Sequence, residues 1–249
     1  MKLTYQLYSS RNHPPLEATA KMLAANGYAA VQGFAHFFED YESKLAVLQA
    51  AGLEMRAAHF GIENLEGDWD RCMAIAKAFG LESIYAPYLM PDDRPADAAG
   101  WQALGARLAE IGKKVNDAGY GFGWHNHDFE LVKLADGATP LELLLTASDT
   151  MQWEADLAWV VRGGADPLAE LNKYKERITS VHVKDIAPAG ECADEDGWAD
   201  VGHGTMDWKG LIAALKDAPV KHYIAEHDKP SDDERFARRS AEFLRSLEA

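Results

Sequence analysis

Short apolar runs alternate along this chain with segments whose apolar residues recur every three or four positions. The runs predict β-strands at residues 3–8, 29–31, 55–59, 83–88, 121–127, 151–157, 178–183 and 222–226. The intervening segments have the period of an amphipathic helix. The clearest of them places Trp101, Leu104, Leu108, Ile111 and Val115 on one stripe. The pattern therefore predicts strands that each lead into a helix.

Capping residues and glycines mark where several of these helices begin and end. Thr139-Pro140 and Asp166-Pro167 each combine a capping side chain with proline at the first helical position. Asp207 precedes another helical segment, and Gly80 and Gly119 follow two more. Such residues are typical of helix boundaries, so they support the division of the chain into strand–helix units.

The alternation of strands and helices predicts a parallel sheet. Eight such units in 249 residues favour closure into a (β/α)8 TIM barrel, a fold of about 250 residues. The alternative is an open doubly wound sheet, but no Gly-x-Gly-x-x-Gly follows the first predicted strand. We find no linker or composition break, so we expect one barrel domain across residues 1–249.

Composition and charge exclude several classes of protein. The chain has 25 Lys+Arg against 40 Asp+Glu, and this net charge of -15 disfavours binding to nucleic acid or to an anionic membrane. The two cysteines, Cys72 and Cys192, form no spacing motif for a disulfide framework or a cysteine zinc site. The N-terminal residues lack the apolar stretch of a signal peptide, and no run approaches the roughly 18 apolar residues of a membrane span. We therefore expect a soluble, cytoplasmic protein.

Buried barrel strands should be apolar, yet several predicted strands end in clustered His, Asp and Glu. These polar ends are residues 59–61, 124–130, 154–156, 181–185 and 225–228. Barrel enzymes carry their sites at the C-terminal ends of the strands, so we expect these side chains to meet there. Side chains alternate along a strand, so His125 and His127 share a face, and either can join Asp156, His182 and Glu226 in one ring.

A ring of imidazoles and carboxylates suits a divalent metal such as Mn, Co, Zn, Fe or Mg. Each residue alone also has a structural interpretation, as a hydrogen-bonded core histidine or as a helix cap. Asp128, Asp185 and Asp228 are candidates for such caps. The repetition on four successive strand ends favours the metal site, because buried unpaired charges are costly unless a cation joins them.

The ordered motifs resemble those of the xylose isomerase-like TIM barrel superfamily. They are His125-Asn126-His127-Asp128-Phe129-Glu130, Asp156-Leu157-Ala158-Trp159 with Gly163-Gly164-Ala165-Asp166-Pro167, His182-Val183-Lys184-Asp185, Gly202-His203-Gly204-Thr205-Met206-Asp207-Trp208 and Glu226-His227-Asp228. They span nearly the whole chain and are most similar to the sugar phosphate isomerase/epimerase branch, which includes inosose dehydratase-like proteins. The set is specific for the superfamily and says little about the substrate.

The resemblance implies a divalent metal (Mn, Mg, Co or Zn) held by one His or acidic ligand from each of strands five to eight. Asp156, His182 and Glu226 match the last three of these positions. Many relatives carry Glu on the fifth strand, where this chain has His125 and, two residues on, His127, so either histidine is a candidate ligand. The histidines in place of this glutamate disfavour the mechanism of the ketose 3-epimerases, which in the family uses a facing pair of glutamates.

The predicted activity is metal-dependent isomerisation or epimerisation of a sugar or keto-sugar. A metal that chelates a carbonyl and a neighbouring hydroxyl would acidify the adjacent C–H and stabilise the enediolate after a base removes the proton. The candidate acid or base is whichever of His125 and His127 is not a ligand, since imidazole titrates near neutrality. Glu130 is a second candidate. Lys184 is a candidate for holding an oxyanion, with a surface lysine as the structural alternative.

Three further residues are candidates for contacting the substrate: Trp124 and Trp159 by stacking on a sugar face, and His59 by donating a hydrogen bond. Gln32 and His203 stand where relatives commonly carry acidic residues, which argues against copying a relative's substrate. The alternative activities are a metal-dependent lyase or dehydratase acting on an inosose or 3-keto-glycoside, an abasic-site endonuclease, which would need a basic groove, and a non-catalytic sugar-binding barrel. We expect a small carbohydrate or cyclitol as the ligand, and self-association into a homo-oligomer is common in the family.

Overall fold

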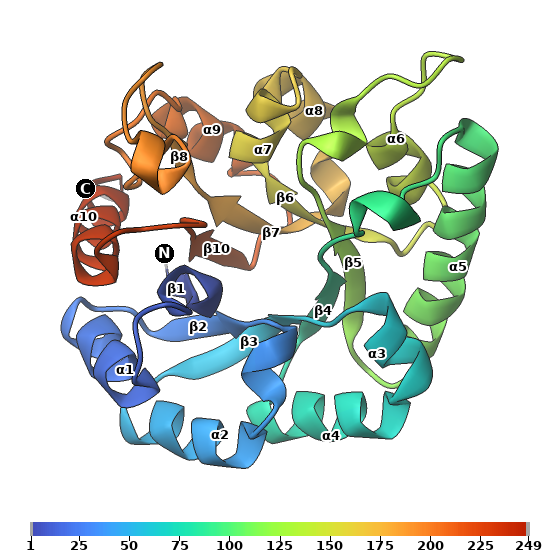
Figure 1. Cartoon of the computed structure of the whole chain (residues 1–249). Coiled ribbons are helices and arrows are strands. Elements are labelled where there is room, and N and C mark those ends of the chain that lie inside the picture. The colour runs from blue at the N-terminus through green and yellow to red at the C-terminus, as the bar shows by residue number, and fades with distance from the viewer. Residues whose placement is uncertain (1, 248–249) are drawn as a thin grey trace.

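Eight parallel strands close on one another around a central axis in the computed structural model, which describes residues 2–247 (Figure 1). The strands are β1 (Leu3–Gln6), β2 (Ala30–Gly33), β3 (Glu54–His59), β4 (Ser83–Ala86), β5 (Gly121–His125), β6 (Gln152–Asp156), β7 (Ile178–Val183) and β10 (His222–Ala225). They follow one another in chain order, and β1 pairs with both β2 and β10 to complete the circle. The predicted (β/α)8 TIM barrel is confirmed.

Helices surround the barrel and cover the outer faces of the strands (Figure 1). The α-helices are α1 (Leu16–Ala25), α2 (Tyr41–Ala50), α3 (Ile62–Gly67), α4 (Trp69–Phe79), α5 (Ala98–Asp117), α6 (Pro140–Leu145), α7 (Leu157–Arg162), α8 (Pro167–Tyr174), α9 (Trp208–Leu215) and α10 (Asp233–Ser246). Short 3-10 helices are η1 (Leu7–Ser10), η2 (Ala35–Phe38), η3 (Pro91–Asp93), η4 (Phe129–Leu131), η5 (Lys175–Arg177) and η6 (Ala193–Glu195). Within residues 2–247, no helix has both the length and the apolar character needed to cross a lipid bilayer.

Several helices begin where the capping residues predict. Thr139, Asp166 and Asp207 each accept a hydrogen bond from a backbone N–H of the first turn, at 3.3, 2.8 and 3.0 Å. These bonds satisfy amide groups that have no partner inside the helix. The apolar stripe of α5 is buried, including Trp101 and Leu108, so the predicted face is the one that packs on the barrel.

The structure also contains elements that the sequence pattern did not predict. Helices α3 and α7 have six residues each, too few to show a helical period. Strands β8 (Asp185–Ile186) and β9 (Trp198–Ala199) form a small antiparallel ribbon in the loop after β7. The strands predicted at residues 3–8, 121–127 and 151–157 are shorter than expected, because their last residues leave the sheet for a 3-10 helix, a loop or α7.

The two faces of the barrel wall differ in chemistry. Outward-facing residues such as Trp153 and Val181 are buried in an apolar core against the helices. The interior contains a set of buried polar side chains: Gln6, Gln32, His59, His125, Glu154, Asp156, Ser180 and His182. Alternation along each strand separates the two sets, since successive side chains point to opposite faces. The fold therefore places ionisable groups in its centre, where they need partners.

Candidate active site

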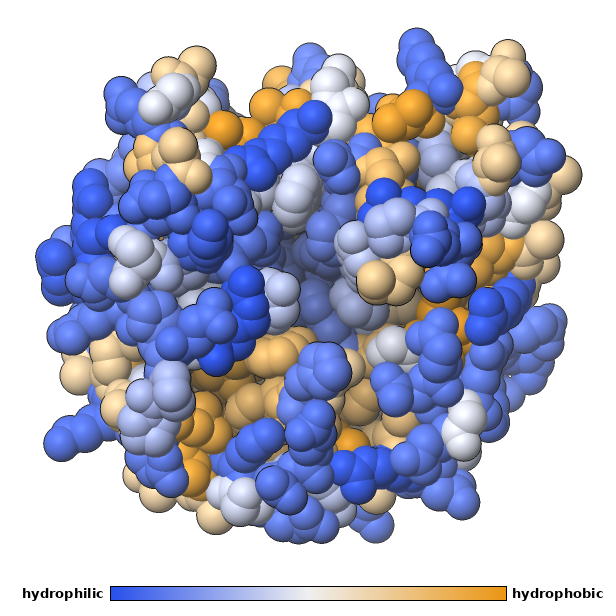
Figure 2. All heavy atoms as spheres, in the orientation of Figure 1, coloured by the Kyte–Doolittle hydropathy of each residue, from blue (hydrophilic) through white to orange (hydrophobic). Residues whose placement is uncertain are grey.

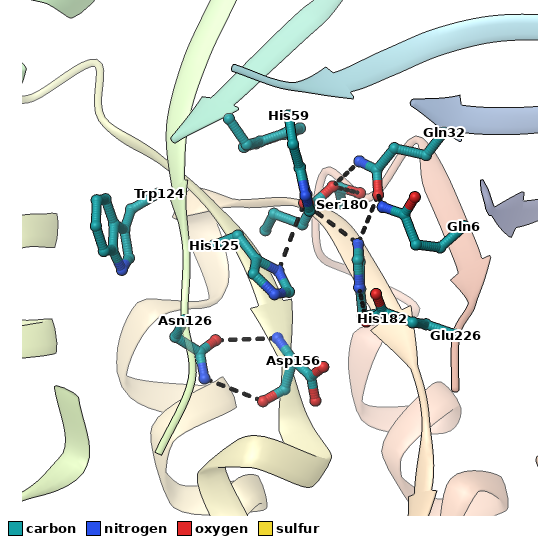
Figure 3. Close-up of polar contacts among 12 residues, drawn as sticks. Gln6, Gln32, His59, Trp124, His125, Asn126, Asp156, Ser180, His182 and Glu226 are labelled. Atoms are coloured by element: carbon teal, nitrogen blue, oxygen red, sulfur yellow. Dashed lines mark hydrogen bonds and ion pairs between the residues drawn. The ribbon is translucent and has the colours of Figure 1, made fainter. Parts of the chain in front are cut away.

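Four ionisable side chains meet at the C-terminal end of the barrel (Figure 3). His125 ends β5, Asp156 ends β6, His182 lies in β7, and Glu226 follows the last residue of β10. Asp156 and His182 are direct partners in the sheet register. One donor atom from each of the four lies within 4.8 Å of the others. The convergence that the strand ends predict is therefore present in the structure.

Two atoms of this group are buried without a hydrogen-bond partner among the described residues. They are Nδ1 of His125 and Oδ2 of Asp156. The other carboxylate oxygen of Asp156 accepts a hydrogen bond from the backbone N–H of Trp159 at 2.9 Å, which caps α7. Burial raises the pKa of Asp156 to about 6, although the Lys184 ammonium opposes the rise. These two atoms, one from an imidazole and one from a carboxylate, belong to a group of two histidines and two carboxylates, a ligand set that fits a divalent cation.

Glu154 supports this group from one layer deeper in the barrel. Its Oε1 accepts hydrogen bonds from Gln32 Nε2 at 2.6 Å and from Ser180 Oγ at 2.8 Å, and its Oε2 pairs with His59. Burial would raise the pKa of Glu154, but the charges of His182 and His59 outweigh it and hold the pKa well below its ordinary value. The sequence analysis did not single out Glu154. Its place two residues before Asp156, on the same face of β6, was the available signal.

A second grouping also lies within 4.8 Å, formed by His59, His125, Glu154 and His182. It shares both histidines with the first group, so the two describe neighbouring layers of one site. Both oxygens of Glu154 are already hydrogen-bonded, whereas Asp156 has a free oxygen. The outer layer is therefore the candidate metal-binding position, and Glu154 and His59 contact its histidines from below.

His182 connects the two layers. Its Nδ1 lies 2.6 Å from Glu226 Oε2, and its Nε2 lies 2.7 Å from Gln32 Oε1, which also accepts from Gln6 Nε2 at 2.6 Å. Burial would lower the pKa of His182, but Glu226 and Glu154 raise it to about 10. The imidazole is thus held in one orientation, as the side chains behind a metal-binding histidine ordinarily hold it. Gln32 supplies the acceptor for Nε2 of this imidazole.

Lys184 is fully buried beside the group. Its Nζ lies 2.8 Å from Asp228 Oδ1, 3.1 Å from Glu226 Oε2 and 3.4 Å from Asp156 Oδ2. Burial would lower the pKa of Lys184, but these three carboxylates raise it above its ordinary value. The surface-lysine alternative is therefore wrong. A permanent ammonium here offsets part of the carboxylate charge, which explains how the carboxylates can gather in a buried site.

The three aspartates expected as helix caps have other environments. Asp228 pairs with Lys184. Asp185 accepts backbone hydrogen bonds from Ile186, Gly202 and Met206, so it holds the β8 ribbon against the loop that contains residues 202–206. Asp128 lines the cavity described below and makes no capping hydrogen bond. Asp128 immediately precedes η4 but its side chain makes no cap, Asp185 is part of β8, and the cap of α10 is Asp232, four residues after Asp228.

A cavity of about 1120 Å³ opens above the group, with His59, His125, Glu226 and Trp159 among its lining residues. His127 also lines it, beyond the end of β5, with its ring centroid 5.0 Å from His125 and 5.3 Å from Trp159. Burial, with a contribution from the Lys184 charge, lowers the pKa of His127 to about 3. Its Nδ1 has no partner within the described residues. His127 therefore presents a neutral imidazole to the cavity.

Trp124 and Glu130 lie outside this cavity. Trp124 projects from the opposite side of β5 to His125 and is buried in the outer core (Figure 3). Its Nε1 donates to Glu130 Oε1 at 2.9 Å, and Glu130 Oε2 accepts from the backbone N–H of His127 at 2.9 Å. Burial raises the pKa of Glu130 to about 8. Neither side chain lines the cavity, so the structure places Trp124 away from any position for stacking on a substrate there and Glu130 away from any position for proton transfer there. The pair instead holds the segment that carries His127.

Sequence and structural comparisons agree with this geometry. The chain is 28% identical over 145 residues to an inosose dehydratase of Lacticaseibacillus casei, a match that covers 51% of this chain and 48% of that relative. It thus spans about half the length of this curated relative. A sugar phosphate isomerase/epimerase from Parabacteroides distasonis superposes with a TM-score of 0.82 at 19% identity, covering 98% of this chain and 93% of that chain. The IOLI protein, solved with a bound zinc atom, superposes with a TM-score of 0.73 at 14% identity, covering 100% and 96%.

The family comparison covers more of the chain than the sequence match to the dehydratase does. The family model described as a xylose isomerase-like TIM barrel matches residues 20–247, from the first helix to the last. The solved structures share the fold, and the sequence match to the dehydratase includes only part of each chain. On the strength of the family match, this chain belongs to the xylose isomerase-like TIM barrel family.

Proposed function

We propose that this protein is a divalent-metal-dependent enzyme that removes a proton beside a carbonyl of a small polyhydroxylated substrate and then eliminates a neighbouring hydroxyl as water. One observation carries the proposal: four donor atoms lie within 4.8 Å of one another under the cavity, and two of the residues present a buried atom with no hydrogen-bond partner among the described residues. Such unpaired buried groups are costly unless a cation occupies the space between them.

His125, Asp156, His182 and Glu226 would hold the metal. When bound, a divalent cation would polarise the substrate carbonyl and stabilise negative charge on its oxygen. Glu154 and Gln32 would keep His182 in position, and Lys184 would limit repulsion between Asp156 and Glu226. These roles belong to the chain's own residues and depend on contacts that are already formed.

His127 is our candidate base. It accepts the proton from the carbon next to the carbonyl, and the electrons of the broken C–H bond move toward the carbonyl oxygen. These electrons then form a double bond between the deprotonated carbon and the next carbon, as the bond from that next carbon to its hydroxyl breaks. The departing hydroxyl takes the proton back from His127 and leaves as water. One imidazole can serve both transfers on one face of the substrate. The open Nδ1 of His127 supports this assignment.

Dehydration is favoured here over the isomerase or epimerase activity predicted from the sequence. An epimerase needs an acid and a base on opposite faces of the reacting carbon, and this chain has His125 in place of a glutamate on the fifth strand. The curated sequence match is to an inosose dehydratase. Isomerisation would begin with the same proton removal by His127 and would return the proton to the neighbouring carbon, so it remains the second candidate.

The cavity favours an uncharged substrate over a phosphorylated one. Its lining contains the carboxylates Glu39, Glu63, Asp68, Asp93, Asp128, Asp196, Glu226 and Asp228, against the guanidinium groups of Arg11, Arg71 and Arg94. Excess negative charge repels a phosphate dianion and is compatible with a neutral polyol. We therefore propose a keto-cyclitol or keto-sugar without a phosphate group.

The proposal is tested by incubating the metal-loaded protein with an inosose in D₂O and following the products by NMR. We expect loss of one water from the substrate, and we expect metal removal by a chelator to stop it. Deuterium incorporation without loss of water would establish the isomerase candidate instead. If a panel of inososes, ketoses and 3-keto-glucose shows neither reaction with Mn, Mg, Co or Zn, the enzymatic proposal is wrong.

A further inference from the structure

The cavity has a second, apolar region that the reaction proposed above does not use. Beyond its polar floor it extends along the segments that follow β1 to β4. This wall, named here the apolar wall, consists of Tyr8, Phe34, Phe38, Phe60, Tyr88 and Met90. Figure 2 shows hydrophobic residues gathered below the polar hollow at the centre of this face. The segments that follow β1 to β4 thus bring a group of aromatic and apolar side chains to the mouth of the barrel, beside charged residues of the same segments such as Arg11, Arg71 and Arg94.

Aromatic contacts make the apolar wall continuous with the polar floor. Tyr8 and Phe34 pack edge to face with ring centroids 5.3 Å apart, and Phe38 stacks on Phe60 at 5.1 Å. Phe60 directly follows His59, whose side chain lines the floor. On the other side, Tyr88 and His127 pack with ring centroids 4.9 Å apart. A ligand held at the floor would therefore reach the aromatic rings of the wall directly.

Exposed hydrophobic side chains concentrate at this place. The large hydrophobic residues exposed within residues 2–247 are Tyr8, Tyr88, Met90, Val132, Val161 and Leu168. Three of them line the cavity: Tyr8 is 36% exposed, Tyr88 is 40% exposed and Met90 is 61% exposed. Single exposed hydrophobic residues are normal on a protein surface, but a group of them around a cavity marks a binding surface.

The size of the cavity also favours a substrate larger than a single polyol ring. Pockets of about 300–1,000 Å³ enclose drug-sized ligands, and this cavity measures about 1120 Å³. A single six-membered polyol ring would leave much of it open to water and would leave the apolar wall uncovered. A larger substrate with an apolar part would cover both the polar floor and the apolar wall.

We propose that the apolar wall binds an uncharged aromatic substituent on the substrate, so that the enzyme acts on a polyhydroxylated ring joined to an aryl group. The chemical class is that of an aryl glycoside or an aryl ether of a cyclitol. The carboxylates that outnumber the arginines in the lining disfavour an acidic aryl group. The polyhydroxylated ring in this inference rests on the proposed function. The aryl group is inferred from the residues of the apolar wall.

The test compares two unreactive probes, phenyl β-D-glucopyranoside and methyl β-D-glucopyranoside, by titration calorimetry with the metal-loaded protein. We expect the phenyl compound to bind at least about tenfold more tightly, because its ring removes apolar surface from water. Phe34→Ala and Met90→Ala should each reduce this preference several-fold while leaving the methyl compound's affinity unchanged. Leu168→Ala removes an exposed hydrophobic side chain that does not line the cavity, so it should leave the preference intact.

Equal affinity for the two probes would overturn the proposal, and so would an unchanged preference in both wall variants. If Met90→Ala instead abolishes a concentration-dependent dimer in sedimentation while the probes bind equally, the wall is a contact between copies and the proposal is wrong. Metal content, measured on the same samples, tests the metal site separately. A preference for the phenyl probe in protein that binds no metal would retain the wall and reject the metal site.

Discussion

The side chain of Asn126 satisfies both backbone polar groups of Asp156. Its Oδ1 accepts from the Asp156 N–H at 3.0 Å, and its Nδ2 donates to the Asp156 carbonyl at 3.1 Å. The backbone pairing of β5 with β6 ends at His125 and Glu154, one residue before Asn126. Asn126 therefore continues the hydrogen bonding of the sheet with its side chain, and this fixes Asp156 where its free oxygen faces the metal-binding position (Figure 3).

Asn126→Ala should destabilise the protein and weaken metal retention. The change leaves the two backbone groups of Asp156 and the indole N–H of Trp153, which also donates to Asn126 Oδ1 at 2.8 Å, without partners. Buried unsatisfied groups cost about 1–3 kcal/mol each, so we expect the free energy of unfolding in urea to fall by about 3 kcal/mol. Asn116→Ala removes an exposed hydrogen bond to Thr150 and should change it by less than about 0.5 kcal/mol. Equal effects of the two changes would contradict this account of Asn126.

Asp156→Ala and Glu226→Ala should each abolish metal retention without unfolding the barrel. Both remove a carboxylate from the group of four, and the strands that carry them remain packed against the helices. Metal content by elemental analysis and secondary structure by circular dichroism measure the two outcomes. Asp207→Ala is the control, because it also removes an aspartate that caps a helix, at a distance from the group. Metal content equal to that of the parent in either site variant would refute the assignment.

His125→Ala and His127→Ala should differ in kind. His125 belongs to the group whose donor atoms lie within 4.8 Å, so its loss should remove metal and turnover together. His127 lies outside that group and lines the cavity, so its loss should leave the metal content unchanged and reduce kcat by about 100-fold or more. Parallel measurement of metal content and kcat separates the two. Identical behaviour of the two variants would show that the division between ligand and base is wrong.

The parent should lose stability relative to Glu130→Gln as pH rises. Burial raises the pKa of Glu130 from 4.5 to about 8, so the folded protein binds this proton more tightly than the unfolded chain. The parent therefore loses stability relative to the variant, whose amide does not titrate, between about pH 4.5 and 8. The change is at most about 5 kcal/mol, since one pKa unit corresponds to about 1.4 kcal/mol. Urea unfolding at pH 5, 6.5 and 8 measures it. A difference between Glu130→Gln and the parent that does not change with pH would contradict the prediction.

Local sequence was enough to predict the barrel, because strands, helices and their caps depend on residues close together in the chain. The predicted strand at residues 178–183 is the observed β7, and the caps at Thr139, Asp166 and Asp207 start the helices where expected. The polar strand ends also predicted which side chains converge, since in a parallel barrel all strand ends lie at one mouth. The sequence left open whether His125 or His127 joined Asp156, His182 and Glu226.

Closure of the barrel decided the features of the site that the sequence did not predict. The strand β5 stops at His125, so His127 enters the cavity beyond the sheet, and Trp124 faces the helices. Glu154 acquires Gln32 as a partner only because residues 122 positions apart meet inside the barrel. The sequence left open whether Lys184 binds an oxyanion or lies at the surface. Only the folded structure shows it among three carboxylates from other strand ends and loops. These features arise from contacts across the barrel, and spacing along one strand specifies which face a side chain takes but not which residues lie opposite it.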